Sequence, residues 1–175
     1  MIRLRTPLSE KDIKPLKIGD KVSVSGKIYT ARDAAHKKLI GLIMAGRPLP
    51  IDVKGQVIFY CGPSPARPGA VTGSAGPTTS SRMDRFTAPL LKAGIKATIG
   101  KGKRGKEAVS AMKKHKAVYL AATGGAGALL SKRIKRARVA AYPELGPEAI
   151  YELEVENFPA IVANDMKGND IFKRK

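Results

Sequence analysis

The sequence predicts an α/β fold built around a mixed sheet. Its central portion, residues 56–121, alternates short apolar runs with stretches of helical periodicity, in the order strand, helix, strand, helix, strand. That alternation is typical of parallel strands joined by helices. Segments nearer both ends of the chain show strand patterning as well, so we expect further strands to flank the central units. Nothing in the composition divides residues 1–175, which suffice for one hydrophobic core, and we therefore expect a single domain.

Residues 21–30 form the first strongly patterned segment. Val22 and Val24, followed by Ile28, alternate with polar neighbours. This period of two predicts a strand with one wet face. We expect the strand to bend at Gly26, because a glycine inside a strand often marks a bulge or a close approach of another backbone.

A helix is predicted directly after this strand, with Asp33 as its N-cap and with Gly46 and Pro48 at its end. Four apolar residues fall on one face of it: Ala35, Leu39, Leu42 and Ile43. Arg32 and His36 lie near its start, four residues apart. Residues at this spacing are neighbours on a helix, so their side chains can point into the same space.

The central units follow in order. Apolar runs predict buried strands at 56–61, 95–99 and 117–121, and helical spacing predicts helices at 81–92 and 106–115. Pro89 lies inside the first of these helices and is expected to kink it.

The last third of the chain returns to alternating patterns. Residues 149–155 and 160–163 are each predicted to form a strand, with a turn at 167–170.

Residues 76–84, Gly-Pro-Thr-Thr-Ser-Ser-Arg-Met-Asp, carry the clearest chemical signal. They place hydroxyls, backbone N–H groups and the guanidinium of Arg82 at a loop-to-helix junction, because Thr79, Ser80 or Ser81 can act as N-cap. The N-terminus of a helix attracts anions. This combination favours a carboxylate site, although a hydroxyl-rich N-cap beside one surface arginine also occurs in ordinary helices.

The charge pattern raises a second class of function. The formal net charge is +19, and residues 92–138 hold fourteen Lys or Arg against one acid, Glu107. Clustered basic residues favour nucleic-acid binding. Few aromatic residues, the absence of tryptophan and the absence of a zinc-finger or RNA-recognition signature disfavour it. The remaining interpretations are a solvated basic face, an acidic partner subunit, and a field that draws in a dianionic substrate.

Two further features bear on location and cofactors. No run of about 18 apolar residues is present, and Met1-Ile2-Arg3-Leu4 does not lead into a signal-peptide core, so we expect a cytoplasmic protein without a membrane span. Cys61 is the single cysteine. Because iron–sulfur clusters usually need several thiolates, another chain would have to hold any such cluster.

An ordered series of motifs accompanies residues 76–84. They are Tyr29-Thr30-Ala31-Arg32-Asp33-Ala34-Ala35-His36-Lys37-Lys38, Phe59-Tyr60-Cys61-Gly62-Pro63, Ile99-Gly100-Lys101-Gly102, Lys114-His115-Lys116 and Leu145-Gly146-Pro147-Glu148-Ala149-Ile150-Tyr151-Glu152. Together they resemble the β subunit of two-subunit class I fumarate hydratases, which corresponds to the C-terminal domain of the single-chain enzymes. The resemblance runs from about Leu8 to Phe172. The related L-tartrate dehydratase β subunit shares the Arg-Asp and Gly-Pro-Thr-Thr elements, whereas residues 149–152 and 158–160 are more similar to fumarase.

This resemblance implies a swivelling β/β/α domain of three layers. It also implies a hydro-lyase that interconverts fumarate and (S)-malate in the tricarboxylic acid cycle. A [4Fe-4S] cluster would be bound by a partner α subunit and not by this chain, within an α2β2 heterotetramer or on a β dimer. Tartrate or a substituted fumarate stays open as the substrate, because one or two side chains, some of them on the partner, would decide the choice. A basic regulatory or nucleic-acid-binding module that reuses the fold is the further alternative.

The resemblance also assigns substrate-binding roles. Arg32 and Arg82 would bind substrate carboxylates, since a guanidinium fork makes two parallel hydrogen bonds to a carboxylate. Lys101 would add a positive charge, and Thr79 completes the substrate-binding set. Two neighbours of Lys101 could exchange roles with it if the alignment shifts, namely Lys103 and Arg104.

Two residues are assigned to proton transfer. The family proposal makes Thr78 a general base, but an alcohol is far too weakly basic unless a carboxylate takes its proton. We expect that carboxylate to come from the partner subunit; without one, Thr78 is only a hydrogen-bond donor. His36 could transfer protons, because the pKa of an unperturbed histidine lies in the physiological range. It could equally orient Asp33 or cap local structure.

Overall fold

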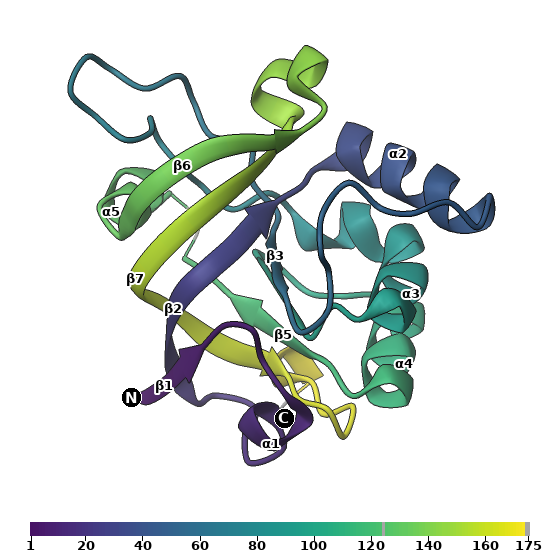
Figure 1. Cartoon of the computed structure of the whole chain (residues 1–175). Coiled ribbons are helices and arrows are strands. Elements are labelled where there is room, and N and C mark those ends of the chain that lie inside the picture. Colours follow the sequence, from purple (N-terminus) through teal and green to yellow (C-terminus); the bar gives the residue numbers. More distant parts are fainter. Residues whose placement is uncertain (124, 174–175) are drawn as a thin grey trace.

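The computed structural model describes residues 1–123 and 125–173, and within them the strands form one seven-stranded mixed sheet (Figure 1). The strands are β1 (Ile2–Arg5), β2 (Lys21–Thr30), β3 (Val57–Phe59), β4 (Ala97–Gly100), β5 (Val118–Ala121), β6 (Ile134–Ala141) and β7 (Ile150–Asn164). Their order is β1-β2-β3-β4-β5-β7-β6, with β1 to β5 parallel and β6 and β7 antiparallel to their neighbours. The predicted α/β class with a mixed sheet is confirmed.

Strand β7 curls the sheet, because it pairs with β2 as well as with β5 and β6. Ile161 of β7 lies opposite Lys21 in β2 and opposite Ala121 in β5. Strands β2 and β5, which β3 and β4 separate in the parallel portion, are therefore joined through one strand.

The helices are α1 (Glu10–Ile13), α2 (Asp33–Met44), α3 (Asp84–Ala93), α4 (Lys106–His115) and α5 (Gly127–Ser131), with 3-10 turns η1 (Ser80–Met83), η2 (Pro143–Glu148) and η3 (Ile171–Lys173). Helices α2, α3 and α4 lie together on one side of the sheet, on the right of Figure 1, and α5 lies on the other side. No helix in the described part of the chain is both long enough and apolar enough to span a bilayer.

Alternating residues of the central strands fill two separate cores. Val57 and Phe59 pack with the apolar residues of β2 and β7 inside the curled sheet. Ile58 and Tyr60 pack with helices α2, α3 and α4 on the other face. The period of two in a buried strand thus supplies both cores from one short segment.

Most predicted elements of the first two thirds are present. Strand β2 bends as predicted, with a register shift between Val24 and Gly26. Gly26 has a φ of +103°, and a Cβ there would lie 2.6 Å from the Oγ1 of Thr6. The N-cap of α2 is Arg32, not Asp33, because Arg32 is still extended whereas Asp33 is already helical.

The helix predicted at 81–92 begins instead with the 3-10 turn η1, whose N-cap is Thr79, and α3 follows from Asp84 with Pro89 inside it.

The prediction of two separate strands at 149–155 and 160–163 is wrong. All of these residues except Ala149 belong to the single strand β7, which runs through Asn157 and Pro159. Asn157 has a φ of +51°, so the strand twists locally where the alternation of apolar residues is interrupted. Strands β1 and β6 were not predicted, since β1 has only four residues and the basic residues of β6 interrupt its apolar pattern.

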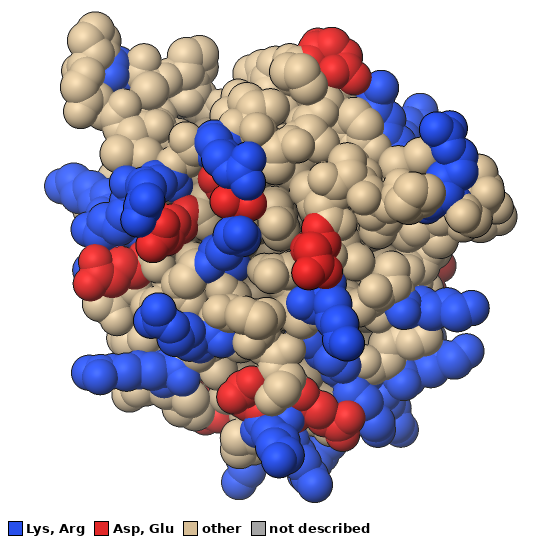
Figure 2. Space-filling view, in the orientation of Figure 1, with Lys and Arg blue, Asp and Glu red and all other residues tan. Residues whose placement is uncertain are grey.

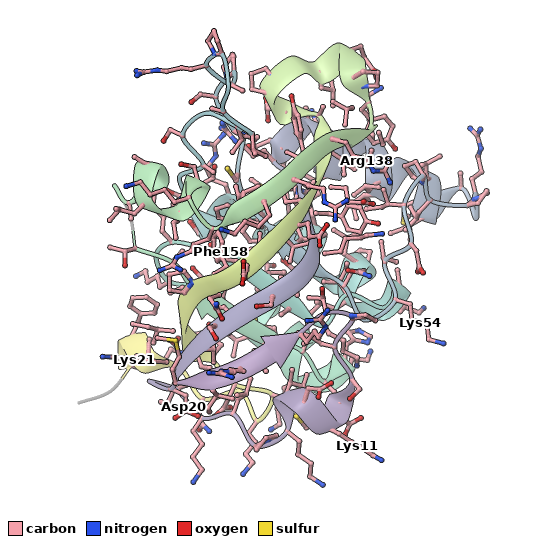
Figure 3. The ribbon with its side chains drawn as sticks, turned by 60° about the vertical axis from the view of Figure 1, so that its left-hand side comes forward. Lys11, Asp20, Lys21, Lys54, Arg138 and Phe158 are labelled. Atoms are coloured by element: carbon pink, nitrogen blue, oxygen red, sulfur yellow. The ribbon has the colours of Figure 1, made fainter. Side chains whose placement is uncertain are left out.

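Basic residues of β6 face acidic residues of β7. The guanidinium of Arg138 donates to both carboxylate oxygens of Glu152, over 3.1 and 2.9 Å. Arg136 and Lys135 lie 3.1 and 3.8 Å from the carboxylates of Glu154 and Glu156. Figure 3 labels Arg138 on β6, beside β7. Figure 2 shows acidic side chains among basic ones on this part of the surface, so cross-strand pairs neutralise part of the basic segment 92–138.

Candidate active site at the carboxyl ends of the parallel strands

The candidate site lies where β2, β3 and β4 end. These parallel strands point the same way, so the segments that follow them meet at one edge of the sheet. Arg32 follows β2, Gly62 follows β3, and Lys101 follows β4. Ligands of α/β proteins commonly bind outside the carboxyl ends of strands, because the loops there converge.

Backbone hydrogen bonds insert the segment 78–80 between the ends of β3 and β4. The N–H of Thr78 donates to the carbonyl of Tyr60 over 2.7 Å, and the N–H of Lys101 donates to the carbonyl of Thr78 over 3.2 Å. The N–H of Ser80 donates to the carbonyl of Lys101 over 2.9 Å. Thr79 and Lys101 are exposed, and Thr78 is half-buried. The structure thus brings three of the predicted site residues together: Thr78, Thr79 and Lys101.

Arg32 and Arg82 come together around the carboxylate of Asp33. Nη2 of Arg82 donates to Oδ2 of Asp33 over 3.0 Å, and Nη2 of Arg32 lies 3.9 Å from the same oxygen. The side chain of Arg82 is 52% exposed and that of Arg32 is 29% exposed. One carboxylate therefore offsets the repulsion between two guanidinium groups, both of which stay accessible to a ligand.

Arg32 is held tightly on its inner side. A Cβ at Gly62 would lie 3.1 Å from the Cδ of Arg32, so the glycine makes room for the arginine. The Nε of Arg32 is buried, has no hydrogen-bond partner among the described residues, and lies 4.0 Å from Oε1 of Glu148. Buried donors are normally paired, so this Nε–H marks a position where an acceptor is missing.

His36 does not share the environment of the Arg32 side chain. It is 1% exposed, its ring stacks on Phe86 at 5.4 Å between centroids, and it meets Tyr60 edge-on at 5.5 Å. Its Nδ1 lies 2.7 Å from the carbonyl oxygen of Arg32. Burial lowers the pKa of His36 to about 4, so the ring is neutral at pH 7 and Nδ1–H donates to that carbonyl. This geometry favours the local structural role, and proton transfer by His36 stays a prediction.

Arg104 cannot take the place of Lys101. It is 4% exposed, and its Nε donates to Oδ1 of Asp84 over 2.6 Å, whereas Lys101 and Lys103 are exposed. Sequence reasoning missed the Arg104–Asp84 pair, because the two residues lie twenty positions apart on different elements and no local pattern links them.

The described residues do not fit an iron–sulfur cluster. No group of three or more histidine, cysteine or acidic side chains among them could hold a metal ion. Cys61 is fully buried, and burial raises the pKa of its thiol to about 12, so it is not the thiolate that a cluster requires.

The site combines two accessible arginines around one carboxylate with a lysine and two threonine hydroxyls, which are groups whose chemistry suits a small carboxylate. Comparison with known proteins makes the assignment specific. The family model described as fumarase C-terminus matches residues 1–175, and the chain belongs to this family.

Named relatives come from two kinds of hydro-lyase. The chain is 45% identical over 172 residues to the putative L(+)-tartrate dehydratase subunit beta of Methanocaldococcus jannaschii, which covers 95% of this chain and 88% of that one. It is 40% identical over 178 residues to the anaerobic class I fumarate hydratase of Escherichia coli and 38% identical to fumarate hydratase 2 of Leishmania major. It spans 99% of its own length in both comparisons but only 32% and 31% of those enzymes. The resemblance to a hydro-lyase β subunit is therefore confirmed.

Proposed function

We propose that this chain supplies the dicarboxylate-binding half of a class I hydro-lyase, most simply a fumarate hydratase that interconverts fumarate and (S)-malate. An α-type partner would hold the [4Fe-4S] cluster and complete the site, in an α2β2 assembly. The observation that carries the proposal is the gathering of Arg32, Arg82 and Lys101 at one edge of the sheet.

Each cation has a distinct task in this proposal. Arg82, more than half exposed, offers its free guanidinium nitrogens to one substrate carboxylate. Arg32 binds the second carboxylate through the accessible part of its guanidinium group, since its side chain is 29% exposed. Lys101 adds positive charge beside Thr79, with which it forms a parallel bridge. The net charge of +19 raises the local concentration of a dianion.

Thr78 would move a proton at the carbon next to a substrate carboxylate. No described residue donates or accepts a hydrogen bond at its side-chain hydroxyl. A hydroxyl needs a neighbouring carboxylate to act as a base, so in this proposal the partner chain supplies that carboxylate. Without it, Thr78 orients the substrate through a hydrogen bond.

The two cores of the fold support the proposed swivelling β/β/α arrangement. One core lies inside the curled sheet, between β2 and β7 and the central strands, and the other lies under the helices. This order gives a sheet layer, a second sheet layer and a helical layer within one proposed domain.

L-Tartrate is the second candidate substrate, because the identity to the tartrate dehydratase β subunit is 45% over nearly the full length of both chains. The test is a substrate panel on the complex with its α-type partner, prepared without oxygen and supplied with iron and sulfide. We expect kcat/KM for (S)-malate to exceed that for L-tartrate and for a methylated malate. Preference for L-tartrate would move the assignment to tartrate dehydratase, and no activity on any of the three would refute the hydro-lyase proposal.

A further inference from the structure

A buried cation that the proposed chemistry does not use lies next to the loop that carries Lys101. Arg104 is 4% exposed, and its Nε donates to Oδ1 of Asp84 over 2.6 Å. Its Nη1 donates to Oγ1 of Thr98 over 3.0 Å. Its Nη2 donates to Oγ1 of Thr87 over 2.6 Å and to the hydroxyl of Tyr60 over 3.3 Å. The guanidinium is thus held by side chains of β4, α3 and the segment after β3.

Stability alone is a weak reason for such a cluster. Taking a guanidinium and a carboxylate out of water is costly, and apolar residues of similar volume are often as stable in the same place. A fully satisfied polar network, by contrast, fixes the relative positions of the elements that it joins. The elements joined here are the ones that carry the candidate site.

Asp84 links the segment of Arg82 to the loop after β4. It lies two residues after Arg82, at the start of α3, and is 9% exposed. One carboxylate oxygen accepts from Arg104, and the other accepts from the backbone N–H of Gly105 over 2.7 Å. Both bonds end within four residues of Lys101.

Tyr119 makes a second link between the same two segments. It is fully buried, and its hydroxyl accepts from Oγ of Ser80 over 2.9 Å while donating to the carbonyl of Gly102 over 2.8 Å. Ser80 follows Thr79, and Gly102 follows Lys101. The segments also approach closely at Gly100, where a Cβ would lie 2.9 Å from a ring carbon of Tyr60 and within 2.0 Å of the Ser80 hydroxyl.

We propose that Arg104, Asp84 and Tyr119 form a positioning network that sets the separation between Lys101 and the segment carrying Thr78, Thr79 and Arg82. None of the three touches the substrate. They hold Lys101, after β4, and Arg82, before α3, at the separation that binding one dicarboxylate requires. This inference rests on the proposed function for its kinetic consequence, but its structural content can be tested without activity.

The kinetic test uses Tyr119→Phe in the complex with the α-type partner. This variant deletes one hydroxyl and keeps the ring, so the segments lose a link without a new cavity. Small misplacement of reacting groups is costly, and we expect kcat to fall about 10- to 100-fold, with a raised KM. The matched control is Thr6→Val, which deletes a buried hydroxyl that donates to the carbonyl of Lys27 over 2.6 Å, outside the network. Thr6→Val should keep the wild-type kcat and KM, even if its Tm falls as far as that of Tyr119→Phe. Equal kinetics in the two variants would overturn the proposal.

Amide hydrogen exchange supplies the test that needs no turnover. In Tyr119→Phe, the N–H groups of Ser80 and Gly105 should exchange faster together, whereas those of β6 and β7 should be unchanged. Unchanged exchange in residues 78–82 and 101–105, or faster exchange throughout the chain, would refute the network. If the wild-type complex lacks hydro-lyase activity, the proposed function fails, and the exchange result still decides whether the network couples the two segments.

Discussion

Two guanidinium groups share one carboxylate at the candidate site, and in the proposed function this sharing keeps both of them available to the substrate. Asp33 contacts Arg82 at 3.0 Å and Arg32 at 3.9 Å without enclosing either group. A carboxylate between two arginines keeps both cations near each other in the free protein. It also leaves each fork with donors for a substrate.

Replacement of Arg82 tests its proposed contact with the substrate. We expect Arg82→Ala in the assembled complex to lower kcat/KM about 10²- to 10³-fold, because a charge-assisted hydrogen bond to the substrate is lost. Arg82→Lys should recover only part of this, since an ammonium lacks the planar fork. Steady-state kinetics with (S)-malate measure both effects. The control is Arg85→Ala, three residues further along the chain, which should retain full activity. An equal loss of kcat/KM in Arg85→Ala would contradict the assignment of Arg82 to substrate binding.

The buried histidine predicts a dependence of stability on pH. The pKa of His36 is about 4 in the folded protein and near 6.5 in an unfolded chain, so the unfolded state binds a proton first as the pH falls. The contribution of neutral His36 to the free energy of unfolding is complete above about pH 6.5. It is lost as the pH falls, and the loss reaches about 3 kcal/mol at pH 4.

Urea unfolding between pH 4 and pH 8 measures this dependence. Below pH 6.5, the free energy of unfolding should depend less steeply on pH in His36→Gln than in the wild type, even though that variant is less stable at every pH. His115→Gln, at the end of α4 and only partly buried, should keep most of the wild-type slope. An unchanged slope in His36→Gln would show that another group is responsible.

At the scale of single residues, the sequence predicted where the candidate residues lie along the fold better than it predicted the environments of their side chains. Motifs placed Arg32, Thr78 and Arg82 correctly at loop-to-helix junctions, because local turn chemistry is readable. Arg32 and His36 lie near the start of α2 as predicted, but their side chains do not share one space: the His36 ring enters the core beside Phe86, whose position depends on tertiary packing. The pairing of Arg104 with Asp84 depends on tertiary packing in the same way.

The strands and loops of the parallel portion are arranged so that β4 ends directly against the segment 78–80. Gly100, the last residue of β4, allows this approach because it has no side chain. The backbone hydrogen bonds between Thr78, Ser80 and Lys101 then form a parallel bridge directly beyond the end of β4.

Two alanine substitutions test this close approach. We expect Gly100→Ala to lower the free energy of unfolding by about 1–3 kcal/mol, because the added methyl collides with Ser80 and Tyr60. It should also reduce activity in the complex. Gly41→Ala, in the middle of α2 with no atom within 4 Å of the new Cβ, should raise the free energy of unfolding by about 0.5–1 kcal/mol. Chemical denaturation measures both, and a stable, active Gly100→Ala variant would contradict the account.

Elements were predictable where an apolar period was intact and not where charge or backbone strain interrupted it. Strand β2 and helices α2 and α4 follow clear periods, and α4 matches its predicted bounds. Strand β6 was missed because Lys135, Arg136 and Arg138 are neutralised only by β7, which sequence alone does not place beside it.

Across the whole molecule, we expect the charge of +19 to attract anions in general without recognising a nucleic-acid sequence. We expect duplex DNA or RNA to be retained at low salt and released by about 0.2 M salt, because binding would consist of counterion release alone. A gel-shift series over salt measures this. Binding that persists above that concentration and depends on the sequence of the nucleic acid would revive the alternative of a nucleic-acid-binding module.

The central claim is that this chain is half of a split hydro-lyase site, and one measurement tests it most directly. The chain would be co-expressed with the α-type reading frame of its source, supplied with iron and sulfide without oxygen, and assayed for the absorbance of fumarate formed from (S)-malate. We predict fumarate formation with both chains together and none with either chain alone. Full turnover by the α-type chain alone, or a stable complex of both chains that is inactive on every dicarboxylate tried, would contradict the claim.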